Sequence, residues 1–162
     1  PMGLDDAPFI LELLNEPAFI QNIADKGVRT LDDARGYIES GPRASYARHG
    51  FGLWVVELKA TGEPLGMCGL IKRDGLDDVD IGFAFLERHG SKGYATESAS
   101  AVLAYGFHQL GLRRIVAITA PFNTASARVL ERIGLRDEGT IVLPQYGGEN
   151  RLFALDAPIG KG

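Results

Sequence analysis

The spacing of apolar positions changes in character along these 162 residues, beginning with a helical pattern. Residues 5–15 carry apolar side chains three and four positions apart, which predicts an amphipathic helix. Thr30, followed by two acidic residues, has the composition of a helix N-cap and predicts the start of a second helix. We expect Gly41-Pro42 to interrupt that helix and residues 45–49 to add one more turn.

The middle of the chain has strand composition instead. Residues 52–58 and 65–71 are apolar segments separated by turn-forming residues 61–64, which predicts an antiparallel hairpin. A polar connection, residues 72–77, then leads to a third predicted strand at residues 79–85. This region therefore supplies the first strands of a sheet.

The last third alternates between the two patterns. We expect a long helix at 94–110, a buried strand at 114–119, a helix at 123–133 ending at Gly134, and a hairpin formed by 139–142 and 151–155. Helices, antiparallel strands and a β-α-β-α-β ending together predict an α/β fold with a mixed sheet. The length and the lack of a linker predict a single domain over residues 1–162.

The turn between the third strand and the long helix is the most informative segment. Its sequence, Gly-Ser-Lys-Gly-Tyr-Ala-Thr-Glu at residues 90–97, brings a glycine-rich backbone to the N-terminus of a helix. Unpaired N–H groups and the helix dipole make such a turn an anion site, usually for phosphate, and Lys92 adds positive charge. The P-loop and dinucleotide-binding patterns are both absent from the sequence, so a different phosphorylated ligand is expected.

Composition narrows the functional classes further. A net charge of −4 argues against sequence-independent nucleic-acid binding, although it permits a local basic pocket. The single Cys68 cannot form an internal disulfide, and neither a long apolar run nor a signal-peptide pattern is found, so we expect a cytoplasmic protein without membrane contact. The three histidines lack metal-ligand spacing, so no metal is expected.

Three sequence blocks, in order and suitably spaced, resemble the GCN5-related N-acetyltransferases (GNAT), particularly the ribosomal-protein N-terminal acetyltransferase branch. Residues 91–95 fit the last five positions of the family signature Gln/Arg-x-x-Gly-x-Gly/Ala, with Gly90 where Gln or Arg is common. Residues 80–83 (Asp-Ile-Gly-Phe) resemble a strand of this branch, and residues 123–135 resemble its Asn-x-x-Ser-x-x-x-Leu-x-x-x-Gly-Phe element. The family's usual first strand is not found, because a helix follows Pro1 almost immediately.

The resemblance implies a mostly antiparallel central sheet, splayed into a V between the family's fourth and fifth strands and flanked by helices. It also implies acetyl-CoA as co-substrate and direct attack of a primary amine, on a protein N-terminus or a small molecule, within a ternary complex. A backbone N–H of the splayed strand would bind the oxyanion. The cofactor-binding residues implied are Phe83, Ala84, Phe85, Ser91, Lys92, Gly93, Tyr94, Ala95, Thr96, Asn123, Ser126 and Arg128.

Asp80 and Ser126 are the candidate catalytic residues. Asp80 would act as a base through water, on the same strand face as Gly82 and Ala84, or would only attract a positively charged substrate. Ser126 would contact the CoA sulfur, or would be a solvent-facing serine in the first helical turn. Many relatives outside this branch have a tyrosine acid where this chain has Leu130, so Ser126 or water would supply any proton.

Other interpretations remain open. Asn123 would bond the pantetheine arm, cap the helix, or do both, and Arg128 would approach the 3′-phosphate or simply lie on the surface. The chain is alternatively a non-catalytic acyl-CoA-binding module, or an acyltransferase with another acyl-CoA or an O-acceptor. The acceptor would enter between residues 16–46 and 144–149, and either a monomer or a homodimer is compatible with the sequence.

Overall fold

The computed structural model describes residues 1–90 and 92–158, and a six-stranded mixed sheet forms its centre. The strands follow the order β1-β2-β3-β4-β6-β5. They are β1 (Leu53–Glu57), β2 (Pro64–Ile71), β3 (Val79–Phe85), β4 (Arg114–Thr119), β5 (Arg136–Leu143) and β6 (Gly148–Asp156). The helices are α1 (Ala7–Leu14), α2 (Pro17–Asn22), α3 (Leu31–Ile38), α4 (Ala44–His49), α5 (Tyr94–His108) and α6 (Thr124–Arg132), with short helical turns η1 (Leu4–Asp6), η2 (Glu39–Arg43), η3 (Glu87–His89) and η4 (Pro144–Tyr146).

The sheet divides where β3 meets β4. These two parallel strands pair only at Val79 with Ile115 and at Asp80 with Val116. Beyond Asp80, β3 continues alongside β2 as far as Phe85, whereas β4 continues alongside β6. The two strands therefore diverge into a V that opens toward their C-terminal ends. This confirms the predicted splay, which lies between the third and fourth strands of the described chain.

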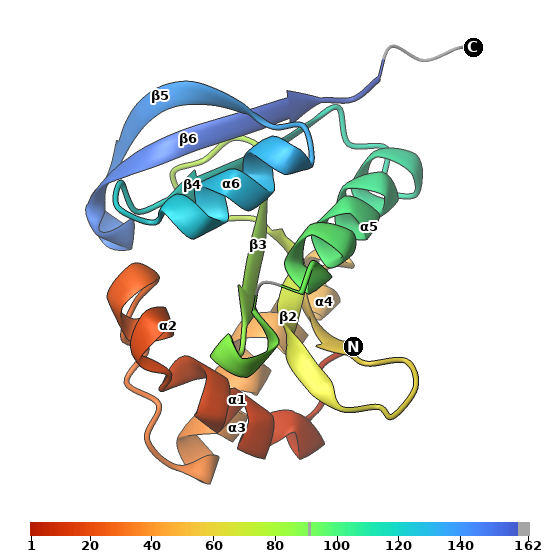
Figure 1. Cartoon of the computed structure of the whole chain (residues 1–162), viewed down its shortest axis with the longest axis vertical. Coiled ribbons are helices and arrows are strands. Elements are labelled where there is room, and N and C mark those ends of the chain that lie inside the picture. Colours follow the sequence, from red (N-terminus) through yellow and green to blue (C-terminus); the bar gives the residue numbers. More distant parts are fainter. Residues whose placement is uncertain (91, 159–162) are drawn as a thin grey trace.

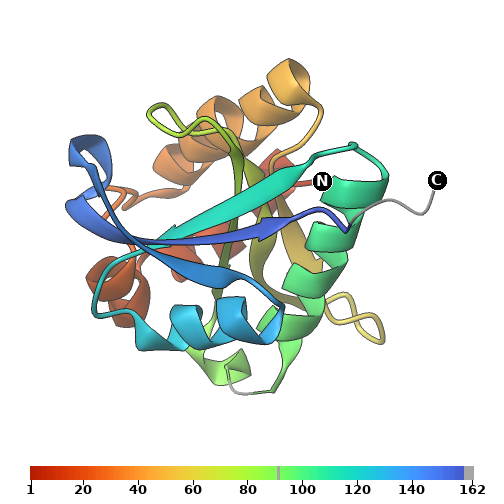
Figure 2. The ribbon, with the colours of Figure 1, turned by 90° about the horizontal axis from the view of Figure 1, so that it is seen from above.

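Helices cover both faces of the sheet, and strand alternation determines which residues face which helices. Val79 and Ile81 belong to a core that includes buried residues of α5 and α6. Ala84, on the opposite face of β3, packs in a second core with α1, α2 and α3. Figures 1 and 2 show the helices of the first fifty residues on one side of the molecule and α5 and α6 on the other.

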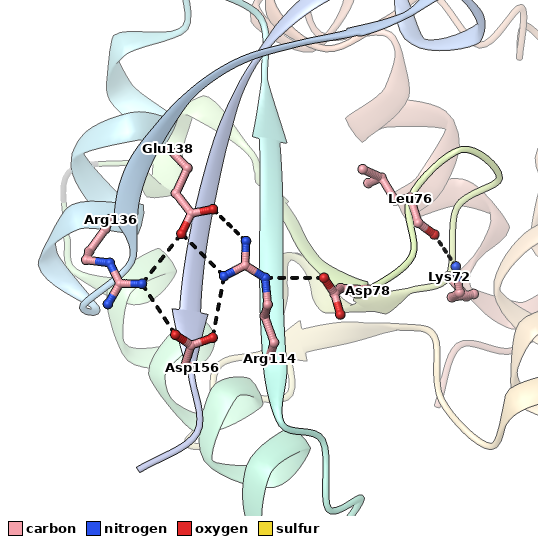
Figure 3. Close-up of polar contacts among 7 residues, drawn as sticks. All are labelled: Lys72, Leu76, Asp78, Arg114, Arg136, Glu138 and Asp156. Atoms are coloured by element: carbon pink, nitrogen blue, oxygen red, sulfur yellow. Dashed lines mark hydrogen bonds and ion pairs between the residues drawn. The ribbon is translucent and has the colours of Figure 1, made fainter. Parts of the chain in front are cut away.

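A network of ion pairs ties the closed end of the V together (Figure 3). Arg114, the first residue of β4, contacts Asp78 just before β3 at 3.2 Å, as well as Glu138 of β5 and Asp156 of β6. Arg136 of β5 contacts the same Glu138 and Asp156. The network links the two halves of the sheet near the short β3–β4 pairing, on the side away from the opening.

The N-terminal helices confirm two local predictions. Thr30 caps α3, since its side chain accepts a hydrogen bond from the backbone N–H of Asp33 at 3.0 Å. The α-helix is interrupted around Gly41-Pro42, because α3 ends at Ile38 and the π-helical turn η2 passes through these residues before α4 begins. The wider turn has room for a proline ring that an α-helix would exclude, and Pro42 is buried there.

Within the described residues, no helix has both the length and the apolar character needed to cross a membrane.

Candidate active site

The glycine turn enters α5 as the sequence predicted. Gly93 is the N-cap of α5 and has φ +82°, a conformation that side chains with a Cβ rarely adopt. No side chain caps this end, and helix geometry leaves the first N–H groups of α5 without partners inside the helix. The N-terminal end of α5 therefore has the hydrogen-bond donors and the positive end of the helix dipole that an anion site needs. The predicted Ser91 lies outside the described residues.

A small cavity of about 260 Å³ adjoins this turn. Phe85 of β3 and residues 93–96, which were predicted as cofactor contacts, line it. Arg132 of α6 also lines it and was not predicted. Its position, one helical turn after Arg128, was the only signal available. Arg128 and Lys92 are exposed, and neither lines this cavity or the larger one described next.

A much larger cavity, about 1230 Å³, occupies the V itself. Residues 81–84 of β3 form one wall, including the predicted Phe83 and Ala84, and residues 117–119 of β4 form another. Segments from both predicted acceptor regions also line it, among them residues 21–24 and 145–147. This cavity and the small one share β3 and α6 as walls, so a ligand lying along β3 could occupy both.

Asn123 and Ser126 lie together at the start of α6 and line the large cavity. Asn123 is buried and caps α6, because its Oδ1 accepts a hydrogen bond from the N–H of Ser126 at 3.2 Å. Its Nδ2 donates to the carbonyl of Asn22, at 3.5 Å, and so joins α6 to the end of α2. The capping role and the cavity-facing position of Asn123 are thus compatible, as expected. Ser126 is half-buried rather than fully solvent-facing.

Asp80 lies at the closed end of the V and is only 1% exposed. Its Oδ2 accepts a hydrogen bond from Nε of Arg73 at 2.7 Å, while its Oδ1 has no hydrogen-bond partner among the described residues. Burial raises the pKa of Asp80 to about 6, although the charges of Arg73 and Lys72 act to lower it. Asp80 is absent from the lining of the large cavity, whereas Arg73 is part of it.

Several side chains around Arg73 complete the site and were missed by the sequence analysis. The Arg73 guanidinium lies over the ring of Tyr146, 4.7 Å from its centre. Tyr37 of α3 lines the same cavity, and burial raises its pKa to about 12. Lys26 lines it too, and its pKa is lowered by partial desolvation and by repulsion from Arg73. No motif connects these residues, because the fold brings them together from separate segments.

Thr119, near the open end of β4, also lines the large cavity. It is buried, and its Oγ1 has no hydrogen-bond partner among the described residues. A buried hydroxyl without a partner is costly unless a ligand or water satisfies it. Thr119 is therefore a candidate ligand contact that the sequence analysis did not identify. As for metal sites, residues 1–90 and 92–158 contain no group of three potential metal-binding side chains.

A splayed mixed sheet with a glycine turn at the end of one arm defines a fold class that known acetyltransferases share. A family model described as an acetyltransferase (GNAT) domain matches residues 1–136. The chain belongs to the GNAT acetyltransferase family. The structure of a GNAT-family acetyltransferase from Bacillus anthracis superposes with a TM-score of 0.79 at 29% identity, covering 96% of this chain and 91% of that one.

Two further proteins are similar to this chain, one in sequence and one in fold. The N-acetyltransferase YnaD of Bacillus subtilis is 33% identical over 114 residues, 70% of this chain and 64% of YnaD. RimL, a ribosomal L7/L12 alpha-N-protein acetyltransferase in complex with coenzyme A, has a TM-score of 0.80 at 18% identity, covering 96% of this chain and 91% of RimL, and so shares the fold. The matched stretches span 55% and 64% of the length of the first two curated relatives.

Proposed function

We propose that the protein is an N-acetyltransferase that transfers the acetyl group of acetyl-CoA to a primary amine by direct attack in a ternary complex. The observation that carries the proposal is the pair of cavities sharing the walls of β3 and α6. The small cavity contains the N-terminus of α5 and the side chain of Arg132, and both can bind a pyrophosphate. The large one passes through the V and gives an amine a route to the same strand.

In this proposal the pyrophosphate lies against the backbone of residues 92–96, and the pantetheine arm follows β3 toward Asn123. The thioester carbonyl then lies in the V, where a backbone N–H of β3 between Phe83 and Phe85 stabilises the oxyanion. Thr119 is a further partner for a polar group of the arm, since its buried hydroxyl lacks one. Arg128 remains the proposed contact for the 3′-phosphate, supported only by its exposed position on α6.

The chemistry needs a neutral amine and a way to protonate the leaving thiolate. The amine nitrogen forms a bond to the thioester carbon, and the C–S bond breaks as the tetrahedral intermediate collapses. Asp80 accepts the surplus amine proton through water, a role supported by a pKa nearer to neutrality than that of an ordinary aspartate. Ser126 donates a hydrogen bond or a proton to the thiolate, since Leu130 cannot.

A non-catalytic acyl-CoA-binding module is the second candidate, and Leu130 in the tyrosine position is the observation that favours it. The deciding experiment incubates the purified protein with acetyl-CoA and a panel of amines, then follows CoA release with a thiol reagent. Release that depends on an amine supports the enzyme. Tight acetyl-CoA binding without turnover of any amine would support the module. The mass of any co-purified cofactor would show whether another acyl group is used.

We also infer a cytoplasmic location. The only cysteine, Cys68, is buried, and burial raises the pKa of its thiol to about 12, which keeps it protonated and unreactive. A chain whose fold uses no disulfide suits a reducing compartment. Fractionation of cells expressing the tagged protein would test this inference, and recovery in a membrane or secreted fraction would contradict it.

A further inference from the structure

The large cavity is lined with positive charge although the whole chain carries a net charge of −4. Four cationic side chains line it, Lys26, Arg48, Lys72 and Arg73, and among the described residues Glu149 is the only carboxylate in the lining. A concave surface with an excess of one sign of charge concentrates ligands of the opposite sign. Asp80 lies behind Arg73 and offsets one of these charges, but an excess of positive charge remains, so the local field of this cavity favours an anion.

Arg73 is the most firmly held of these cations. Its side chain is 22% exposed and is fixed between the carboxylate of Asp80 and the ring of Tyr146. Its hydrogen bond to Asp80 uses only the Nε atom, and Tyr146 is its other close polar neighbour, so the guanidinium retains N–H donors beyond those that these two residues use. A guanidinium fixed in this way presents its remaining N–H donors in the planar geometry that carboxylates and phosphates match.

Lys26 and Tyr37 extend this group of donors. The neighbouring Asp25 does not neutralise Lys26, because it pairs with Arg29 at 2.7 Å. Partial desolvation and the charge of Arg73 lower the pKa of Lys26, so a bound anion would relieve an existing repulsion. Burial keeps Tyr37 protonated, so its hydroxyl is available as a donor.

These cations do not serve the phosphates of CoA in the arrangement proposed above. Asp80, the partner of Arg73, lies near the start of β3, whereas the glycine turn follows its end, so about 16 Å of strand separates Asp80 from Phe85. Asp80 also belongs to the strand face of Ala84, which packs against the N-terminal helices rather than against α5 and α6. The positive charge therefore lies on the acceptor side.

We propose that the acceptor is an amine that also carries an anionic group, a carboxylate or a phosphate, held by Arg73 together with Lys26 and Tyr37. This inference rests on the proposed acetyltransferase function and names the substrate class of the same site. Polyamines and other polycations are poor acceptors, because they would meet an excess of positive charge in the cavity.

The test compares kcat/KM at saturating acetyl-CoA for amines that differ only in the anionic group. Free amino acids are paired with their amides to probe the carboxylate, phosphoethanolamine with ethanolamine to probe the phosphate, and spermidine serves as the polycation. We expect the anionic member of at least one pair to be favoured by about 10-fold or more, as for a charge-assisted hydrogen bond. The preferred pair identifies the anionic group. Amides have the less basic amine, so intrinsic reactivity opposes the expected preference in that pair.

Two lysine variants test whether the preference for anionic amines arises in the cavity. Arg73→Gln would leave Asp80 buried without its partner and could unfold the chain, so the test uses Lys26→Glu, in an exposed residue. Lys26→Glu should lower the preference for the anionic amine by roughly 10-fold, chiefly by raising its KM. Lys59→Glu, in the turn between β1 and β2 and outside the cavity lining, makes the same change in net charge and should leave the preference unchanged.

The outcomes separate the two proposals. Absence of CoA release with every amine, while acetyl-CoA still binds, would overturn the proposed function itself. If the neutral amine were turned over at least as efficiently as its anionic partner in both pairs, or if spermidine were the best acceptor, the function would stand and the acidic acceptor would be overturned. An equal loss of preference in Lys26→Glu and Lys59→Glu would also overturn it, because net charge and not the cavity would then be responsible.

Discussion

Ser126 is half-buried, and it lines the cavity in the V. Its backbone N–H donates to Asn123, and its side chain belongs to the cavity lining, where the hydroxyl can reach a ligand. We expect Ser126→Ala to lower kcat by roughly 10- to 100-fold, the lower range for loss of a proton donor, with little change in acetyl-CoA affinity. Steady-state kinetics and calorimetric titration would measure the two effects.

The matched control for Ser126 is Ser98→Ala in α5, a serine that lines neither cavity. Unchanged turnover in Ser126→Ala would give the serine a purely structural role. Equal effects of both substitutions would point to a general loss of folded protein rather than to chemistry.

Asp80 predicts a dependence of stability on pH whose sign follows from its pKa. The folded value is about 6 and the ordinary value is 3.8, so the native state binds this proton more tightly than the unfolded state. The stability contributed by the protonated carboxyl is therefore full below pH 4 and is lost as the pH rises through 6, by at most roughly 3 kcal/mol. Asn cannot ionise, so Asp80→Asn does not undergo this loss. The free energy of unfolding of the variant should therefore rise relative to that of the original protein as the pH increases from 4 to 7.

Urea unfolding of both proteins at several pH values would measure this difference. Parallel stability profiles would contradict the raised pKa of Asp80. If Asp80 is also the proton acceptor, kcat/KM for an amine of low basicity should rise with pH through a midpoint near 6 to a plateau above it in the original protein, and Asp80→Asn should lose that rise. The kinetic measurement separates a role in proton transfer from a purely structural ion pair.

Residues near one another in sequence were easier to predict than residues that meet through folding. Asn123 and Ser126, predicted as cofactor contacts from one sequence block, both line the large cavity because they share one turn of one helix. Arg73, Tyr37 and Lys26 were missed because they come from a loop, a helix and another loop, with no fixed spacing. Their proximity arises from the packing of the N-terminal helices against one face of β3, which the sequence does not display.

At the scale of elements, the predicted strands and helices are largely confirmed. Local signals such as the Thr30 cap and the two-strand hairpin act through contacts within a few residues. Gly41-Pro42 was interpreted by the same local rules, and the α-helix is interrupted there, but the sequence did not indicate that the chain would continue as a π-helical turn. The splay of the sheet came from family resemblance, since no residue pattern encodes where β3 and β4 stop pairing.

The start of α5 allows a charge-only test of the anion site. Gly93 has a positive φ, and a Cβ added there would meet no atom within 4 Å, so substitutions strain the backbone without a clash. Asn and Asp tolerate this conformation about equally and have nearly the same shape. We expect Gly93→Asp to weaken acetyl-CoA binding by about 10-fold or more relative to Gly93→Asn, through repulsion of the pyrophosphate.

Calorimetric titration of acetyl-CoA into both Gly93 variants would measure this difference, and thermal unfolding would verify that their stabilities agree. Equal affinities of the Asp and Asn variants for acetyl-CoA would show that the pyrophosphate does not bind at the glycine turn. The same substitutions should not alter the preference among acceptor amines, because the acceptor side lies at the other end of β3.

At the scale of the whole molecule, the V must stay open at one end while the two halves of the sheet remain attached at the other. Only two residue pairs join β3 to β4, so the ion pairs of Arg114 with Asp78, Glu138 and Asp156 supply a further connection there (Figure 3). Arg114 in turn holds the pKa of Glu138 below its usual range.

We expect Arg114→Met to lower the Tm by about 2–4 °C, a modest loss because these side chains are partly exposed to solvent. The neighbouring exposed Arg113→Met removes the same charge and should have less effect, and high salt should narrow the gap between the two variants. Differential scanning calorimetry at low and high salt would measure both shifts, and an equal fall in Tm for the two variants would assign the effect to net charge instead of to the network.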